Sequence, residues 1–270
     1  MTGPATEAVL KSVADGVATL TLNRPQALNA LDSTMAEALG ARVVEIENDP
    51  AVRAVVLAGA GGHFMAGGDL KWFQGFLEKP AAEKRRLFEV FVREGAHRSV
   101  LALRRMPKPV IASVRGAAAG FGLSLVLASD LALASENAVF TLAYVNIGTS
   151  PDGGSTHALV RAVGMKRAME IALLGERFDA KRALALGIVN RVVPEGELDR
   201  ATAALARRLA AGPAEALGRT KALINASWDA SLAEQLDAEA ASFAACAAGA
   251  DFAEGIRAFV EKRPAKFGRA

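Results

Sequence analysis

Two glycine-rich turns in this sequence could bind a negatively charged group through their backbone N–H groups. Residues 110–130, VIASVRGAAAGFGLSLVLASD, begin as a buried strand, pass through small residues and end as an apolar helical run. Residues 63–70, HFMAGGDL, have the same design, with a strand before them and a helix start at Asp69. The first N–H groups of a helix lack internal partners and attract negative charge. Each turn alone fits a tight packing turn equally well, but two such turns could each aim one N–H at the same oxygen.

The elements that would position these turns alternate between strand and helix. Strand patterns cover residues 17–22, 53–58, 110–114, 131–134, 139–142 and 188–193. Helical patterns cover residues 34–48, 69–105 with a break at Lys79-Pro80, 123–128, 156–174 and 180–186. Thr34 and Glu37 have the spacing of a capping box at the first of these helices. This alternation predicts an α/β core.

The last part of the chain has a different pattern, because strand signals stop near residue 198. Apolar residues then recur at helical spacing, and Ser231 with Glu234 forms a second capping box. We therefore expect a core over residues 1–197 and a helical region over residues 198–270. The apolar faces of these helices should pack against the core or against another subunit.

Composition narrows the classes of partner. The 270 residues are enough for one or two domains with a large core. Lys plus Arg outnumber Asp plus Glu by only three, and the sequence has no long basic run. This balance argues against nucleic acid as the main partner and allows a phosphate-bearing small ligand. Cys246 is the single cysteine, so a reducing compartment is expected. A signal peptide and a membrane-spanning run are not indicated, which predicts a cytoplasmic protein without a membrane partner.

Several common catalytic motifs are absent. The sequence has no P-loop, and residues 59–64, GAGGHF, fail the dinucleotide fingerprint at its last position. Ser124 and Ser155 lie outside a G-x-S-x-G nucleophile motif. No metal is expected, because the histidines lack ligand spacing and are interpreted as structural or surface residues: His63, His97 and His157. His63 keeps an alternative as a ligand contact, and Cys246 is interpreted as inert.

Six segments, in order, resemble the enoyl-CoA hydratase/isomerase family, also called the crotonase family. They are NRPQALNAL (23–31), HFMAGGDL (63–70), VRGAAAGFGLSLVLASD (114–130), IGTSPDGGS (147–155), GERFDAKRALALGIVNRVVP (175–194) and AFVEKRPAKF (258–267). The resemblance implies an α/β fold, a crotonase-like spiral of ββα repeats with a C-terminal helical region. It also implies a homotrimer or a hexamer built as a dimer of trimers, with the last helices assembling subunits and covering the active site.

The resemblance implies an acyl-CoA thioester substrate held by its carbonyl oxygen between two backbone N–H groups. By position these are the N–H groups of Gly68 and Phe121, which agrees with the interpretation of the two turns. Such preorganised donors stabilise the charge that builds on the oxygen of a thioester enolate, by about 3–4 kcal/mol each. Phe121 stands where the family commonly has glycine, and its ring is expected to shape the acyl pocket.

The same resemblance implies the contacts of coenzyme A, which is part of the substrate; no other cofactor is expected. The matching positions are Ala27, Leu28, Ala66, Asp69 and Leu70. Lys262 matches a terminal lysine that in relatives approaches the CoA phosphates, sometimes from a neighbouring subunit. A solvated tail lysine is the alternative for Lys262.

The type of reaction depends on carboxylates. Hydratases of the family use two glutamates, and this chain has Ser124 and Tyr144 at those positions, which argues against hydration. Asp152 lies where isomerases of the family often carry their acidic residue, and the loop resembles ring-epoxide isomerases of phenylacetyl-CoA breakdown. Asp152 is therefore expected to be the acid/base of an enoyl-CoA isomerase. A helix cap is the alternative for Asp152, and Tyr144 either orients substrate, supplies a proton or packs.

Two other classes stay open on the same scaffold. One is a different acyl-CoA reaction, either hydration or thioester hydrolysis. The other is an acyl-CoA binder without catalysis. The glycine turns support binding in every case, so the products formed from a panel of thioesters distinguish these classes.

Overall fold

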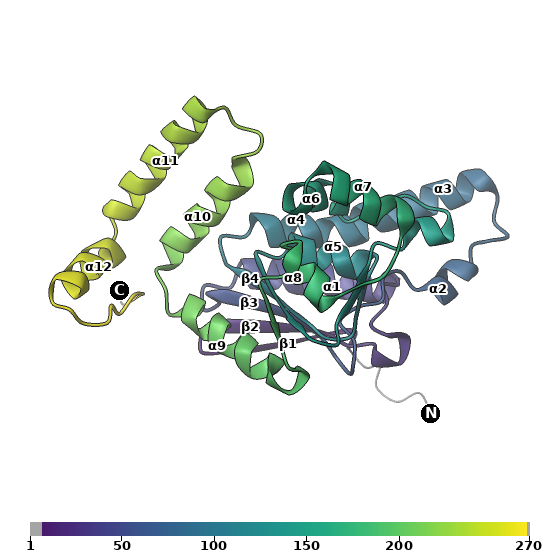
Figure 1. The fold of residues 1–270 in the computed structure, drawn as a ribbon, viewed down its shortest axis with the longest axis horizontal. Helices are drawn as coiled ribbons and strands as arrows, with labels where there is room; N and C mark the ends of the chain where they lie inside the picture. The colour runs from purple at the N-terminus through teal and green to yellow at the C-terminus, as the bar shows by residue number, and fades with distance from the viewer. Residues whose placement is uncertain (1–6, 269–270) are drawn as a thin grey trace.

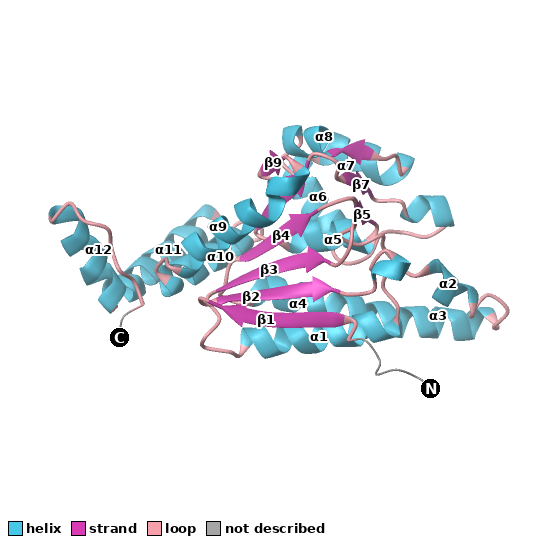
Figure 2. Ribbon diagram, turned by 90° about the horizontal axis from the view of Figure 1, so that it is seen from below, coloured by secondary structure: helices cyan, strands magenta, loops and turns pink. Residues whose placement is uncertain are grey.

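The computed structural model describes residues 7–268, and a six-stranded sheet forms its centre (Figure 2). The strand order is β1-β2-β3-β4-β6-β9, and every neighbouring pair is parallel except β1 with β2. The strands are β1 (Val9–Ala14), β2 (Val17–Leu22), β3 (Ala54–Gly59), β4 (Val110–Val114), β6 (Leu131–Ser135) and β9 (Arg191–Val193). A second sheet of three strands, in the order β5-β7-β8, comprises β5 (Ala117–Ala119), β7 (Val139–Thr141) and β8 (Phe178–Asp179).

Helices connect these strands and cover the larger sheet. The α-helices before the C-terminal region are α1 (Ser33–Glu47), α2 (Leu70–Gln74), α3 (Ala81–Val90), α4 (His97–Arg105), α5 (Phe121–Ala128), α6 (Ser155–Val163), α7 (Met165–Leu174) and α8 (Ala180–Ala185). A π-helical segment, η2 (Phe91–Ala96), joins α3 to α4. Three 3₁₀ turns complete this part: η1 (Pro25–Ala27), η3 (Tyr144–Ile147) and η4 (Glu195–Glu197).

The central strands of the large sheet are apolar because helices cover both faces of the sheet. All five residues of β4 are buried, as expected for a parallel strand covered on both sides. Helices α1, α4 and α5 lie on one face. On the other face, α9 (Leu198–Ala210) packs Leu198 and Ala206 against Val56, Ile111 and Leu133. Helix α9 is therefore part of the core packing, and the helical section that stands apart begins at α10 (Figure 1).

The structure confirms the α/β core and corrects the expected start of the first helix. Asp32, rather than Thr34, caps α1, because its carboxylate accepts the N–H of Met35. The predicted capping box of Ser231 and Glu234 is present. The sequence pattern gives no sign of β1, because Val9 is the one fully buried side chain of this edge strand. Within residues 7–268, no helix is long and apolar enough to cross a membrane.

The C-terminal section consists of α10 (Ala214–Ala226), α11 (Leu232–Ala247) and α12 (Ala250–Val260), and extends away from the sheet (Figure 1). One buried ammonium group attaches it. Lys221 Nζ lies 2.8 Å from Asp130 Oδ2 and donates to the carbonyl oxygens of Leu103 and Lys108 at 2.7 and 3.0 Å. Asp130 in turn accepts the N–H of Val110 at the start of β4. The ion pair of Lys221 and Asp130 is therefore a tether that joins α10 to β4, the strand that leads into the second glycine turn.

We expect Lys221→Met to lower the free energy of unfolding by about 3–5 kcal/mol, because it leaves the largely buried carboxylate of Asp130 without its counter-ion. Guanidinium unfolding measures this change. Lys79→Met is the matched control, since Lys79 pairs with Glu83 on the surface and its loss should cost at most about 1 kcal/mol. Equal effects of the two substitutions would contradict the tether.

Candidate functional site

The two glycine turns lie in contact. The N–H of Met65 donates to the carbonyl oxygen of Ala117, and the N–H of Ala119 donates to that of Met65, both at 2.9 Å. Gly67 and Gly120 have φ angles of 93° and 50°, which favour glycine. A Cβ on Gly122 would lie 2.3 Å from the carbonyl oxygen of Met65. The backbones of the two turns therefore approach each other more closely than side chains would allow.

The N–H of Gly68 points away from the segment beside it. Leu31 pairs with Gly68 as in a parallel sheet: its N–H donates to Gly67 at 2.7 Å, and its carbonyl accepts from Asp69 at 2.9 Å. In this pattern the paired residue directs its own N–H to the opposite side. Phe121 is the first residue of α5, where an N–H has no helical acceptor. Among residues 7–268, neither N–H has a protein acceptor, so both are free to bind a ligand oxygen.

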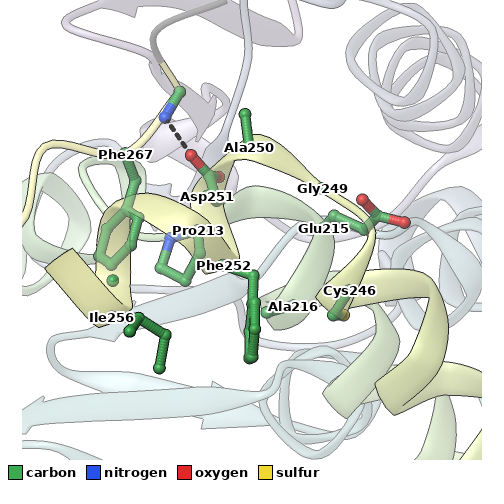
Figure 3. A pocket seen from close by; sticks show the side chains of 12 residues that line it. Pro213, Glu215, Ala216, Cys246, Gly249, Ala250, Asp251, Phe252, Ile256 and Phe267 are labelled. Atoms are coloured by element: carbon green, nitrogen blue, oxygen red, sulfur yellow. Dashed lines mark hydrogen bonds between the residues drawn. The ribbon is translucent and has the colours of Figure 1, made fainter.

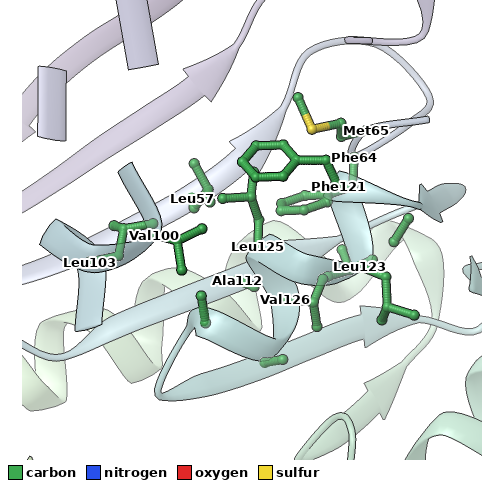
Figure 4. Packing of buried hydrophobic residues seen from close by; sticks show 14 of the residues in the cluster. Leu57, Phe64, Met65, Val100, Leu103, Ala112, Phe121, Leu123, Leu125 and Val126 are labelled. Atoms are coloured by element: carbon green, nitrogen blue, oxygen red, sulfur yellow. The ribbon is translucent and has the colours of Figure 1, made fainter. Parts of the chain in front are cut away.

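The ring of Phe121 is buried in the core, which corrects the expectation that it shapes the acyl pocket. The side chain is 2% exposed and lies among Phe64, Leu57 and Leu125 (Figure 4). Its ring atoms lie 2.9 and 3.0 Å from the position of a Cβ on Gly153. The backbone of Phe121 thus faces the site, while its ring supports the loop that carries Asp152.

Asp152 and Tyr144 form the polar centre beside these turns. The hydroxyl of Tyr144 donates to Asp152 Oδ1 at 2.5 Å and lies 3.3 Å from Ser124 Oγ. The side chain of Asp152 does not cap α6, whose N-cap is Gly154. Its backbone carbonyl instead accepts from the hydroxyls of Ser124 and Ser155, at 3.1 and 2.8 Å. These bonds hold the loop and leave the carboxylate directed at Tyr144.

This pair lies next to the Phe121 turn. The Cζ of Tyr144 lies 3.8 Å from the position of a Cβ on Gly120, and Ser124 Cβ lies 2.8 Å from that of a Cβ on Gly153. Ser124 and Phe121 occupy successive turns of the same helix, α5. The structure therefore brings together four of the predicted residues: Gly68, Phe121, Tyr144 and Asp152.

Burial sets the protonation of this pair. Burial raises the pKa of Asp152 above its ordinary value, although the hydrogen bond from Tyr144 and the charge of His97 oppose that rise. Burial, and next the charge of Asp152, raise the pKa of Tyr144. Tyr144 therefore stays protonated and donates, whereas Asp152 is a stronger base than an exposed aspartate. The sequence, which indicates a structural or surface role for His97, does not predict this effect of its charge. The π-helical segment η2 that precedes it has no clear sequence signature.

We expect Tyr144→Phe to raise the pKa of Asp152 further, because the ionised carboxylate loses its hydrogen bond. The midpoint of the Asp152 titration should therefore move to higher pH. A carbon-13 NMR titration of the Asp152 carboxyl group measures it. Ser124→Ala is the control, since Ser124 contacts the phenol and the loop carbonyl but not the carboxylate, and its shift should be smaller. A midpoint that stays fixed or falls in Tyr144→Phe would contradict this role.

The predicted CoA segments run side by side. The N–H of Ala66 donates to the carbonyl oxygen of Leu28 at 3.0 Å, and Ala27 precedes Leu28 at the end of η1. Leu28 and Leu70 expose 44% and 54% of their surface, as apolar contacts for a ligand would require. The carboxylate of Asp69 is engaged by the N-terminus of α2 and by Arg24, so only its backbone is available to a ligand.

Other candidate positions lie elsewhere. Lys262 follows α12, at the end of the molecule opposite α2 in Figure 1, so it does not reach these turns within one chain. His63 Nδ1 accepts the N–H of Ala117. A cavity of about 430 Å³ lies between α10 and the α11–α12 turn, where Cys246 and Phe252 line it (Figure 3). Across residues 7–268, no three His, Cys, Asp or Glu side chains gather as metal ligands.

The chain is similar to known proteins over nearly its whole length. The family model described as enoyl-CoA hydratase/isomerase matches residues 12–270. The 1,2-epoxyphenylacetyl-CoA isomerase of Escherichia coli is 38% identical over 261 residues, covering 97% of this chain and 98% of the relative. A probable enoyl-CoA hydratase of Rhodobacter capsulatus is also 38% identical, covering 94% and 95%.

The solved structures include close matches to the whole fold. The crystal structure of an enoyl-CoA hydratase from Polaromonas sp. JS666 superimposes with a TM-score of 0.90 at 35% identity, covering 96% of this chain and 99% of that one. The fold is therefore the crotonase fold that the six sequence segments suggested. This chain belongs to the enoyl-CoA hydratase/isomerase family.

Proposed function

We propose that this protein is an enoyl-CoA isomerase in which Asp152 moves one proton along the acyl chain. The observation that carries the proposal is a single partly buried carboxylate, hydrogen-bonded by Tyr144, beside two free backbone N–H groups. By the family resemblance, Ser124 and Tyr144 stand where hydratases carry their two glutamates. Among the described residues, Asp152 is the only carboxylate hydrogen-bonded within this group of side chains.

The reaction follows from these groups. The N–H groups of Gly68 and Phe121 bind the thioester oxygen of a 3-enoyl-CoA. Asp152 removes a proton from C2, and the C–H electron pair passes into a dienolate whose negative charge rests on the bound oxygen. The protonated Asp152 then returns the proton to C4, and the double bond moves from C3–C4 to C2–C3. One carboxylate suffices, since the proton leaves and returns through the same group, and the reaction needs no further cofactor.

The environment of Asp152 suits this role. A raised pKa makes the carboxylate a better base for a weakly acidic C–H bond. Tyr144 keeps one oxygen occupied, which leaves the other free to accept the proton. The backbone donors stabilise the dienolate at the step where its charge appears. We propose Ala27, Leu28, Ala66, Asp69 and Leu70 as the segment that carries the CoA part of the substrate, mainly through backbone and apolar contacts.

A panel of 2-enoyl-, 3-enoyl- and aryl-acyl-CoA thioesters tests the proposal, with products identified by mass and NMR. We expect the 3-enoyl thioester to become a 2-enoyl thioester of unchanged mass. Addition of water would identify a hydratase instead, and release of free CoA would identify a hydrolase. Binding of thioesters without any turnover would identify a non-catalytic binder.

We also propose that the C-terminal helices assemble a homotrimer or a hexamer. Large apolar side chains of this section are exposed, at fractions from 53% to 86%: Ile224, Trp228, Leu232, Leu236, Phe243, Ile256, Phe259 and Val260. An uncovered surface of this kind favours association. Assembly is also the way in which Lys262 would approach an active site, that of a neighbouring subunit. A cytoplasmic location remains a prediction from the single cysteine and from the absence of signal-peptide and membrane-spanning patterns in the sequence.

Sedimentation of the full chain tests the assembly. We expect three or six copies at micromolar concentration, and Phe259→Glu should shift the distribution toward monomer, since Phe259 is 86% exposed in the isolated chain. Glu37→Lys is a control for a charge change on the exposed side of α1. A wild-type monomer would contradict the proposal.

A further inference from the structure

Arg24 joins three segments that surround the Gly68 donor. Its side chain is largely buried, with 19% of the surface exposed. Nη2 lies 2.9 Å from Asp32 Oδ2 and 2.9 Å from Asp69 Oδ2, and Nη1 donates to the carbonyl oxygen of Ala30 at 2.6 Å. The backbone N–H of Arg24 donates to the buried Asn29 at 2.9 Å. A planar guanidinium can serve several acceptors at once in a fixed geometry.

Both aspartates also cap a helix. Asp32 Oδ1 accepts the N–H of Met35 at the start of α1, at 2.9 Å. Asp69 Oδ1 accepts the N–H groups of Lys71 and Trp72 at the start of α2, at 3.1 and 3.2 Å. Each carboxylate thus divides its oxygens between a helix N-terminus and the guanidinium. Arg24 therefore connects the first turns of two helices through their caps.

These contacts flank the peptide that presents the N–H of Gly68. Leu31 and Gly68 form the bridged pair, and Asp32 and Asp69 are the next residues on the two segments. Arg24 binds both Asp32 and Asp69, so it holds the two paired segments together immediately after Leu31 and Gly68. Helix α2 also contacts Gly68 through a side chain. Phe73 Cζ lies 2.6 Å from the position of a Cβ on Gly68.

We propose that Arg24 is a positioning residue that fixes the direction of the Gly68 N–H by clamping Asp32 to Asp69. This inference rests on the proposed function, in which that N–H binds the thioester oxygen. A donor stabilises developing charge only while it is held in the productive direction. Without the clamp, α2 and the Gly68 peptide can rotate away from the Leu31 segment, and the polarisation of the thioester carbonyl falls.

The test compares Arg24→Met with Arg42→Met. Arg42 also contacts two carboxylates, Glu7 and Glu45, but it lies on the exposed side of α1. The readouts are kcat, KM and the infrared carbonyl stretch of a bound, carbon-13-labelled saturated acyl-CoA, which does not react. We expect Arg24→Met to lower kcat about 10²-fold, with a smaller change in KM. The carbonyl band should move back toward its frequency in water, and Arg42→Met should match wild type.

Two further variants separate positioning from stability. Arg24→Lys keeps the charge but not the planar fork, so it should restore part of the band shift. Asp69→Asn keeps a cap for α2, since asparagine caps as well as aspartate, but weakens the clamp. It should reproduce the loss of band shift even if Arg24→Met does not fold.

The outcomes distinguish this inference from the function on which it rests. The positioning role is overturned if Asp69→Asn and Arg24→Met keep the full band shift of the wild type and an unchanged kcat. A loss of thermal stability alone in these variants does not support it. No band shift in the wild type overturns the oxyanion site itself and the inference with it. A band shift lost in both variants and partly restored in Arg24→Lys supports the clamp.

Discussion

Asp152→Asn should reduce conversion of a 3-enoyl-CoA by about 10²–10⁴-fold, the usual contribution of general acid–base catalysis. Asparagine has nearly the same shape and can still accept the hydroxyl of Tyr144, whose bond to Asp152 measures 2.5 Å. It cannot accept the proton from C2. The affinity for a saturated acyl-CoA should therefore stay close to that of wild type while turnover is lost, as steady-state kinetics and calorimetry will measure.

Asp229→Asn is the matched control for this substitution. Asp229 pairs with Arg161 on the surface, and 76% of its side chain is exposed. The same chemical change there should leave turnover unaltered. Undiminished turnover in Asp152→Asn would remove Asp152 from the mechanism and leave the backbone donors without a partner base.

Gly122→Ala should impair both the fold and the donors. A Cβ on Gly122 would lie 2.3 Å from the carbonyl oxygen of Met65, and a backbone atom cannot move aside as a side-chain end can. The substitution therefore pushes the two glycine turns apart. We expect a loss of about 1–3 kcal/mol in the free energy of unfolding and a fall of about 10²–10³-fold in kcat.

Gly40→Ala provides the control for Gly122→Ala. Gly40 lies within α1, and a Cβ there would meet nothing within 4 Å. Alanine is the better helix former, so this variant should be more stable by up to about 1 kcal/mol, with unchanged turnover. Denaturant unfolding and turnover of both variants measure the contrast. If Gly122→Ala retains wild-type stability and turnover, the close contact of the two turns is not needed for folding or catalysis.

The sequence predicted the turns better than the groups around them. Small residues between a strand and a helix have a local cause, so the order of residues is enough to recognise the turns at 63–70 and 110–130. The orientation of Gly68 depends on Leu31, which lies far away in sequence. The burial of the Phe121 ring depends on Gly153 above it. Such relations between distant segments leave no periodic signal.

The contrast is sharpest at Asp152. The sequence left a helix cap and a catalytic base as alternatives, because both fit an aspartate before Gly-Gly-Ser. Its bond to Tyr144 requires the 3₁₀ turn at Tyr144 and the left-handed glycines Gly153 and Gly154. The clamp of Arg24 on Asp32 and Asp69 is hidden for the same reason, since it spans segments that the chain order separates.

The helical region was predicted from amphipathic spacing, which left both the core and another subunit open as the surface that its apolar faces contact. The structure divides it, because α9 covers the sheet while α11 and α12 keep their large apolar residues exposed. Spacing shows that a helix has an apolar face. It does not show which surface covers that face, which depends on the tertiary and quaternary packing.

The most direct test of the central claim follows the proton itself. A 3-enoyl-CoA carrying deuterium at C2 is converted in ordinary water, and the 2-enoyl product of the first turnovers is examined by NMR. If Asp152 carries the proton from C2 to C4, part of the deuterium appears at C4. Product that holds only solvent hydrogen at C4, or that is a 3-hydroxyacyl-CoA, would contradict the direct return of the same proton by Asp152.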